Sequence, residues 1–214
     1  MGFFESFPRP PRPEPRPEPP RRPWMRPEFV VPASVPVDLV LLRTEDVAVT
    51  IGLLRAYATG FEFTVDSRSR HAAQGHRLGM INHYVPGSTD TGDDLRLGLE
   101  FSDGRRAVLD EHGYPHSAES DPNAVVVMPG GGGGSDRSWS SRYWIHPLPS
   151  PGRLSFVATW PAFGVTEARV DVEADAILAA SSRALELWPE APGPALGGST
   201  FGVVTAGRPD RDDD

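Results

Sequence analysis

The chain has 214 residues, a formal net charge of −8 at pH 7 and no cysteine. Without cysteine it cannot form a disulfide framework, a zinc–thiolate site or a cysteine nucleophile. All its basic residues are arginines, and the acidic excess, with no basic stripe in the expected folded part, argues against nucleic-acid binding. The sequence has neither an apolar run of about 18 residues nor a signal-peptide pattern, so we expect a cytoplasmic protein without a membrane segment.

Proline dominates the first part of the chain. Residues 7–32 form a proline tract in which Arg-Pro-Glu-Pro occurs twice in tandem. Proline fixes φ and lacks an N–H donor, so we expect an extended polyproline-II spacer here. We therefore predict that residues 1–35 are a disordered tail rich in proline, arginine and glutamate. A second interpretation treats Phe3, Phe4 and Phe7 as an apolar docking peptide that the spacer holds away from the domain.

The apolar residues that follow the tail alternate with a period of two. Successive side chains of a strand point to opposite faces, so each segment is expected to bury one face and expose the other. The expected buried sets are Val37, Leu39 and Leu41; Val47, Val49, Ile51 and Leu53; Phe61, Phe63 and Val65; and Leu95, Leu97, Leu99 and Phe101. In the third set, Glu62 and Thr64 alternate with the apolar residues and are expected to face water.

Further strands and turns complete a β-rich pattern. Asp103-Gly104 suits a tight hairpin, because Asp-Gly tolerates positive φ. The remaining expected strands contain Ala124–Met128; Leu154, Phe156, Ala158 and Trp160; and Thr166, Ala168, Val170 and Val172. Short strands with frequent turn signals are typical of a sandwich or barrel. We predict a mainly β fold, an antiparallel β-sandwich of about nine strands with one C-terminal α-helix and disordered tails.

The expected helix follows the last of these strands. An apolar stripe with three- and four-residue spacing consists of Ile177, Leu178, Ser181, Ala184, Leu185 and Trp188. Asp171 is a candidate N-cap and Pro189 ends the helix. The β-sandwich domain with this helix is expected to span residues 36–190, and residues 191–214 are expected to form a disordered acidic tail.

Five consecutive glycines, Gly130–Gly134, form the most site-like stretch of the chain. A phosphate-binding P-loop is excluded, since it needs a lysine and an immediately following helix. We interpret the run as a flexible connection between two strands. Trp139, Tyr143 and Trp144 follow it, and we select them as candidates for binding a ligand or partner. The alternative is that these aromatic residues pack in the core or on a sheet face.

No residue is assigned a catalytic role, no metal ligand is assigned and no cofactor is expected. Asp90-Thr91-Gly92 matches the tripeptide of aspartic-protease half-sites, but it lies among polar residues rather than on an apolar strand. Histidines fall in two loop-like regions, residues 69–94 and 111–122: His71, His76, His83, His112 and His116. Their spacing matches no metal motif, so surface histidines are the expected interpretation.

Five segments carry a distinctive sequence: Arg43–Val49, Ala56–Phe63, Leu97–Arg105, the glycine run with Trp144–Pro149, and Trp160–Val165. Together they resemble a protein family of high-GC Gram-positive (actinobacterial) bacteria that carries no assigned activity. The resemblance extends over residues 36–188. It implies a cytoplasmic β-rich domain and no mechanism.

Two functional hypotheses follow. The first is a non-enzymatic cytoplasmic interaction or scaffold module that uses the proline-rich tail as a tether. A protein partner would then contact that tail or a sheet face. The alternative is a small-ligand binder or a metal-dependent enzyme that uses the histidine-bearing loops of residues 69–94 and 111–122.

Overall fold

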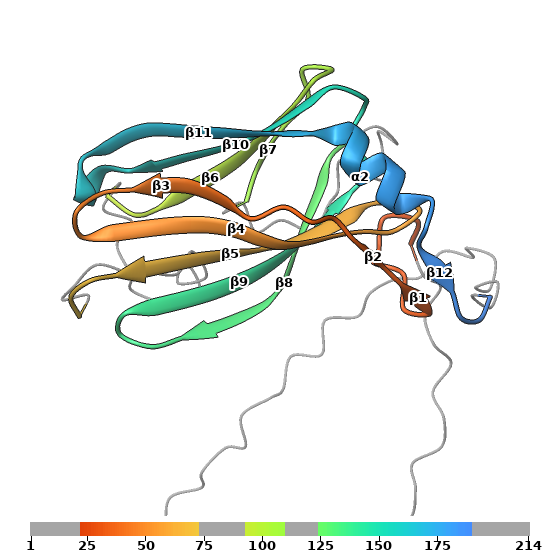
Figure 1. The fold of residues 1–214 in the computed structure, drawn as a ribbon, viewed down its shortest axis with the longest axis horizontal. Helices are drawn as coiled ribbons and strands as arrows, with labels where there is room; N and C mark the ends of the chain where they lie inside the picture. The colour runs from red at the N-terminus through yellow and green to blue at the C-terminus, as the bar shows by residue number, and fades with distance from the viewer. Residues whose placement is uncertain (1–21, 73–92, 110–123, 190–214) are drawn as a thin grey trace, which may run out of the picture. The chain divides into compact units, whose positions relative to one another are not determined.

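The structure, a computed structural model, describes residues 22–72, 93–109 and 124–189. One compact unit spans Pro23–Glu190; a second comprises Met1–Arg22 and Ala191–Asp214 and lies, except for Arg22, outside the described residues. The first unit is mainly β, with antiparallel sheets that form a sandwich (Figure 1). Nine of its twelve described strands have three or more residues. The predicted fold class is therefore confirmed.

The larger sheet has six strands and carries the site described below. Its order is β2-β4-β5-β9-β8, and β3 also pairs with β4. The strands are β2 (Ala33–Ser34), β3 (Leu39–Arg43), β4 (Val47–Ala56), β5 (Phe61–Ser69), β8 (Val126–Gly134) and β9 (Ser138–His146). Long antiparallel ladders join β4, β5, β9 and β8, so residues far apart in sequence lie side by side across this sheet.

The second sheet has four strands in the order β11-β10-β6-β7. They are β6 (Arg96–Phe101), β7 (Arg106–Val108), β10 (Arg153–Trp160) and β11 (Val165–Glu173). A short 3-10 turn, η3 (Pro161–Phe163), joins β10 to β11, and helix α2 (Ala174–Ser181) follows β11. A two-stranded ribbon pairs β1 (Val30–Val31) with β12 (Leu185–Glu186). No helix in these described ranges has the length and apolar character needed to cross a bilayer.

Aromatic and aliphatic side chains from both sheets fill the space between them. Phe63 of β5 meets Phe156 of β10 edge-on, with ring centroids 5.0 Å apart, and also stacks on Tyr143 of β9. All three rings are buried, and burying a side chain of this size contributes about 2 kcal/mol. The alternation predicted for β5, β6 and β10 is confirmed on this inner face: Phe61, Val65, Leu97, Leu99, Phe101, Leu154, Ala158 and Trp160 are all buried.

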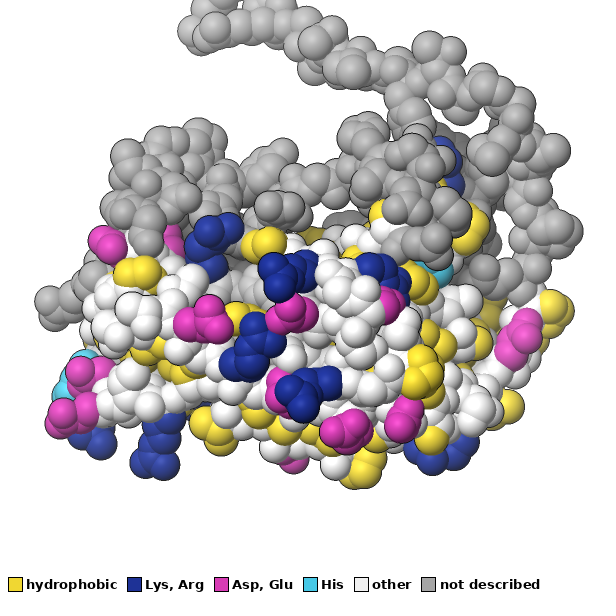
Figure 2. Space-filling view, turned by 90° about the horizontal axis from the view of Figure 1, so that it is seen from above, with side chains coloured by type: hydrophobic (Ala, Val, Ile, Leu, Met, Phe, Trp, Pro, Cys, Tyr) yellow, Lys and Arg dark blue, Asp and Glu magenta, His cyan; other side chains and the backbone are white. Residues whose placement is uncertain are grey.

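The outer face of the four-stranded sheet is polar and its charges pair with one another. Glu100 accepts hydrogen bonds from Arg106 at 2.7 Å and from Arg169 at 2.6 Å. Arg153 lies 3.4 Å from Asp171, which also accepts a hydrogen bond from Ser155. Viewed from the side of β10 and β11, arginine and acidic side chains are interspersed over this surface (Figure 2).

The glycine run is part of a strand, which corrects the prediction of a flexible connection. β8 continues through Gly134, and Gly132, Gly133 and Gly134 pair with residues of β9. The ladder shifts register between Pro129 and Gly132, where Gly131 has φ of +90°. Glycine in the interior of a strand weakens that strand. Here β9 pairs with the run and supplies backbone hydrogen-bond partners. The connection between β8 and β9 is instead the short turn at residues 135–137.

A register shift in β4 also corrects one predicted face. The ladder between β4 and β5 shifts between Gly52 and Arg55. Leu53 adopts φ of +48° and is 66% exposed, whereas Leu54 is buried. An extra residue in a strand reverses which side chains face the core, so Leu54 takes the inward position predicted for Leu53.

The helix in the structure is shorter than the apolar stripe from which it was predicted. α2 ends at Ser181, and its N-cap is Glu173 rather than Asp171, which belongs to β11. Leu185 and Glu186 pair with β1, and Trp188 packs edge-on against Phe29. The C-terminal part of the stripe therefore forms a strand with the N-terminal segment, a long-range pairing that local spacing does not reveal.

The N-terminal boundary of the folded unit is also corrected. We predicted a tail through residue 35, but the compact unit begins at Pro23. Residues 30–31 and 33–34 are paired strands, and Trp24 and Val35 are buried. Residues 1–21 and 190–214 lie outside the described residues, and the tail predictions for them stay predictions.

Candidate functional site

A pocket lies on the outer face of the six-stranded sheet, opposite the sandwich core. Phe61 and Phe63 point inward, so Glu62 between them points outward. The register places Glu62 beside Arg55 of β4 and beside Trp144 of β9, and Trp144 beside Met128 of β8. Directly paired residues share a face of the sheet. Glu62, Trp144 and Met128 of this row line the pocket.

Residues 23–26, here called the covering segment, fold over one end of this row. Trp24 is buried, and its carbonyl oxygen accepts a hydrogen bond of 2.8 Å from the indole nitrogen of Trp144. Tyr57 packs edge-on against the Trp144 ring, with centroids 5.1 Å apart. Gly60 makes room for that ring, because a Cβ at this position would lie 2.6 Å from it. The covering segment and the absent side chain together fix the position of Trp144.

Glu62 is the central charged group of the pocket and only 1% of its side chain is exposed. Its Oε2 accepts a hydrogen bond of 3.3 Å from Arg26 of the covering segment. Its Oε1 forms an ion pair with Arg55, whose nitrogen lies 2.7 Å away. Among the described residues, no group donates a hydrogen bond to Oε1. A buried carboxylate oxygen is thus only partly satisfied.

Arg26 lies on the polar side of the pocket and contacts the buried Tyr57. Arg26 donates a hydrogen bond of 3.0 Å to the Tyr57 hydroxyl. Burial by itself lowers the pKa of Arg26, but its hydrogen bonds and the charge of Glu62 outweigh this effect and raise it. Burial raises the pKa of Tyr57, and the Glu62 carboxylate raises it further. At neutral pH the guanidinium is therefore charged and the phenol is neutral.

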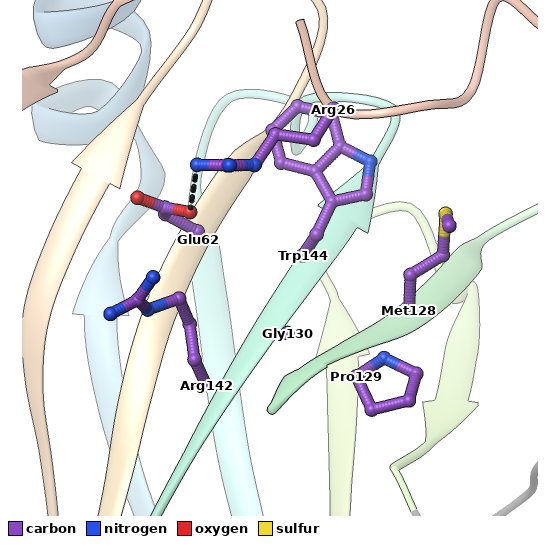
Figure 3. Close-up of a pocket in the computed structure, with 7 residues that line it drawn as sticks. All are labelled: Arg26, Glu62, Met128, Pro129, Gly130, Arg142 and Trp144. Atoms are coloured by element: carbon purple, nitrogen blue, oxygen red, sulfur yellow. Dashed lines mark hydrogen bonds and ion pairs between the residues drawn. The ribbon is translucent and has the colours of Figure 1, made fainter. Parts of the chain in front are cut away.

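The pocket has a volume of about 140 Å³ and two chemically different sides. Figure 3 shows Arg26 and Arg142 on the side of Glu62, and Met128 and Pro129 of β8 on the other side. The Arg142 stem packs close to Gly130, since a Cβ on that glycine would lie 3.3 Å from it. Arg142 makes no hydrogen bond or ion pair with any residue in the described ranges. The charged side therefore contains one guanidinium without a counterion there.

The three aromatic residues predicted to bind a ligand or partner lie in different environments in the structure. Trp144 lines the pocket. Tyr143 points into the core, where it stacks on Phe63. Trp139 is half-buried against the core, and its indole nitrogen donates a hydrogen bond to Ser141 at 2.7 Å. The packing alternative holds for Tyr143 and Trp139, and binding by any of the three stays a prediction.

The histidine-bearing loops and the Asp-Thr-Gly tripeptide are mostly outside the described residues. His71 is described; it is exposed and its Nε2 lies 3.7 Å from Asp46. His76, His83, His112, His116 and Asp90–Gly92 are not described. Within residues 22–72, 93–109 and 124–189, no group of three or more histidine, aspartate or glutamate side chains is placed to hold a metal ion. The metal-dependent alternative stays a prediction.

Sequence reasoning missed Glu62, Arg26 and Tyr57. Alternation placed Glu62 on a face exposed to water, and Arg26 fell inside the predicted tail. One available signal was Trp24, a large apolar residue that a solvated proline spacer does not need. Another was the position of Glu62 as a single charge between two phenylalanines.

Comparisons with protein-family models, with curated proteins and with solved structures found no match. The resemblance to an actinobacterial family therefore stays a prediction.

Proposed function

We propose that this chain is a non-enzymatic binding module whose ligand site is the pocket over Glu62. The observation that carries the proposal is a pocket lined by a buried carboxylate, two arginines and an indole, with Arg55 paired to the same carboxylate. A segment distant in sequence, residues 23–26, closes over this row and holds the Trp144 ring. Concave sites that combine apolar walls with a few placed polar groups are typical of small-molecule recognition.

The same groups favour binding over catalysis. General acid–base catalysis works best with groups whose pKa lies near the working pH. Arginine stays protonated, and the pKa of Tyr57 is raised above the ordinary phenol value of 10.0. Neither group exchanges protons readily at neutral pH. Guanidinium groups and an indole face instead supply charge, hydrogen bonds and contact area, which are the elements of recognition.

A fragment titration followed by NMR tests the proposal. The protein labelled with ¹⁵N is titrated with a library of small polar and apolar fragments. We expect saturable shifts of the Trp144 indole N–H and the Gly130 amide, because both belong to the pocket lining. A library that produces no saturable shift at these two positions would contradict the proposal.

Two variants of β8 supply a matched control. Gly130→Leu places a side chain against Arg142 inside the pocket, whereas Gly133→Leu adds the same side chain where nothing lies within 4 Å. We expect Gly130→Leu to abolish fragment binding and Gly133→Leu to preserve it. Equal binding by the two variants would place the site elsewhere. The role of the proline-rich tail as a tether to a protein partner is a separate prediction, and these variants leave it unchanged.

A further inference from the structure

Most of the large apolar side chains that are exposed in the described residues lie on or beside the ribbon of β1 and β12. These two strands form a sheet of their own, at the end of the sandwich beyond α2 (Figure 1). The ladder pairs Val31 with Leu185, and the Leu187 N–H donates a hydrogen bond of 2.7 Å to the Phe29 carbonyl oxygen, which extends the pairing by two residues. Directly paired residues and alternate residues of a strand share a face. Phe29, Val31, Leu185 and Leu187 therefore lie on one face of the ribbon.

These four side chains and the neighbouring Trp188 are here called the ribbon face. Leu185 is 60% exposed and Leu187 47%. Trp188 packs edge-on against Phe29 and is 63% exposed. From these exposed fractions and the areas typical of such side chains, the five residues leave roughly 400 Å² in contact with water. An apolar patch of this size is as large as the largest one on a typical monomer and often marks an interaction site.

A ribbon of two strands is only marginally stable in water by itself. Its stability rises when its apolar face packs against another strand, a helix or a second apolar surface. Both residues of β12 are exposed, and within the described ranges no element packs over the ribbon face closely enough to bury it. A partner that covers this face would therefore stabilise the ribbon as well as remove apolar area from water.

The charges around the ribbon face favour a second copy of this chain over a charged partner. Residues 25–31 and 183–188 contain two arginines and two glutamates, so their formal charges cancel, although the whole chain has a net charge of −8. A locally neutral patch does not attract an anionic lipid surface, and the acidic remainder of the chain is repelled by one. Two copies that meet through their neutral patches keep their acidic surfaces apart, where salt screens the repulsion.

The size of the ribbon face suits a pair of identical copies. A two-fold axis places the same patch of each copy against the other. Two such patches with their polar rims bury about 1,000 Å² in total, which is the lower limit for a specific interface. Tryptophan is among the residues that contribute most to binding at interfaces, and Trp188 is the most exposed side chain of the patch.

We infer that the ribbon face docks against the ribbon face of a second copy of this chain and forms a weak two-fold dimer. The inference goes beyond the proposed function and does not depend on which ligand the pocket binds. An interface of this small size predicts reversible association in the micromolar range rather than a permanent dimer.

Sedimentation velocity of the full chain from about 1 μM to about 1 mM tests the inference. Leu185→Arg places a charge in the ribbon face, whereas Leu53→Arg places it on β4, where the leucine is 66% exposed. Both variants reduce the net negative charge by one, so neither increases the overall repulsion between copies. We expect the unmodified chain and Leu53→Arg to dimerise alike, and Leu185→Arg to associate about tenfold more weakly or less, because it buries an unpaired charge. A chain that is monomeric at every concentration, or equal effects of the two variants, overturns the inference.

Dilution of the ¹⁵N-labelled chain locates the interface without any substitution, and it decides the matter if Leu185→Arg does not fold. We expect the Trp188 indole N–H and the Leu187 amide to shift with concentration, and the Leu53 amide to stay in place. Concentration-dependent shifts confined to another surface overturn the inference. Vesicles of neutral phosphatidylcholine supply a separate arm: a chain that stays monomeric but binds these vesicles, and loses this binding in Leu185→Arg, identifies a lipid surface as the occupant and overturns the second copy.

Discussion

The two outer faces of the sandwich carry the same arrangement of charges in different surroundings. On the four-stranded sheet, Glu100 lies between Arg106 and Arg169 and is 26% exposed. On the six-stranded sheet, Glu62 lies between Arg26 and Arg55 and is 1% exposed. The first carboxylate is hydrogen-bonded by both arginines; the second has one oxygen that accepts no hydrogen bond within the described residues.

This difference shows that two carboxylates with the same number of ion pairs can differ strongly in burial. Water competes for an exposed carboxylate, so pairs like those of Glu100 contribute little to stability. A buried carboxylate depends on its protein partners, and losing one leaves a charge without solvation.

Removing one arginine from each carboxylate should separate the faces most clearly. We expect Arg55→Met to lower the free energy of unfolding by about 3 kcal/mol, because Glu62 stays buried with Arg26 as its remaining partner. Arg106→Met removes one partner of Glu100, which is partly exposed, and should leave the unfolding midpoint almost unchanged. Urea denaturation of both variants measures the contrast. Equal midpoints for the two variants would mean that water solvates Glu62 once Arg55 is removed. The contrast between the two faces would then be wrong.

Two glycine positions test how rigidly the pocket wall is held. A Cβ on Gly60 would collide with the Ile145 carbonyl oxygen and lie 2.6 Å from the Trp144 ring. On the four-stranded sheet, a Cβ on Gly98 would lie 3.3 Å from the Ala107 carbonyl oxygen. We expect Gly60→Ala to cost about 2 kcal/mol by overpacking and Gly98→Ala distinctly less.

The Trp144 indole N–H provides the readout of this second prediction. Its NMR resonance should shift in Gly60→Ala, because the added methyl group would displace the ring and strain its hydrogen bond to the Trp24 carbonyl oxygen. It should stay in place in Gly98→Ala. A tolerated Gly60→Ala with an unshifted indole would show that the wall adapts and that the pocket lacks a fixed shape.

The sequence reveals the parts of this fold that depend on local patterns. Alternation identified the inward faces of β5, β6 and β10, because each strand with one buried face shows the same period. It failed for Glu62, whose outward face is covered by residues 23–26, distant in sequence. The glycine run and Leu185 were misassigned for the same reason, since β9 and β1 supply the pairing that makes them strands. Partners that lie far along the chain leave no local signal.

The glycine run allows a direct test of strand against flexible loop. A Cβ on Gly134 would collide with the Ser138 carbonyl oxygen and lie 2.7 Å from the Trp139 Cα, whereas a Cβ on Gly133 meets nothing within 4 Å. We expect Gly134→Ala to lower the free energy of unfolding by about 1.5 kcal/mol. Gly133→Ala should be neutral or slightly stabilising, because it reduces the freedom of the unfolded chain. A flexible loop would tolerate both substitutions alike, so equal thermal midpoints would contradict the β8–β9 ladder.

The smallest expected effect is a difference in pH dependence between the two sheets. Burial lowers the pKa of His146, on β9, below its ordinary value of 6.5, and a hydrogen bond with the Thr59 backbone opposes the shift only in part. Its Nδ1 is buried and has no hydrogen-bond partner among the described residues. The unfolded chain therefore binds a proton more readily than the folded one. Stability is fully present above pH 6.5 and is lost as the pH falls from there toward the folded pKa.

Glu100 should respond in a different pH window. Hydrogen bonds from Arg106 and Arg169 lower its pKa below 4.5, so its contribution is present above that value and is lost as the pH falls below it. We expect His146→Gln to remove part of the decline that begins at pH 6.5, and Glu100→Gln to leave that part unchanged. Thermal midpoints measured across both windows distinguish the two groups. A decline below pH 6.5 that persists in His146→Gln would assign the near-neutral dependence to another group, and the buried imidazole would then be adequately solvated in the folded state.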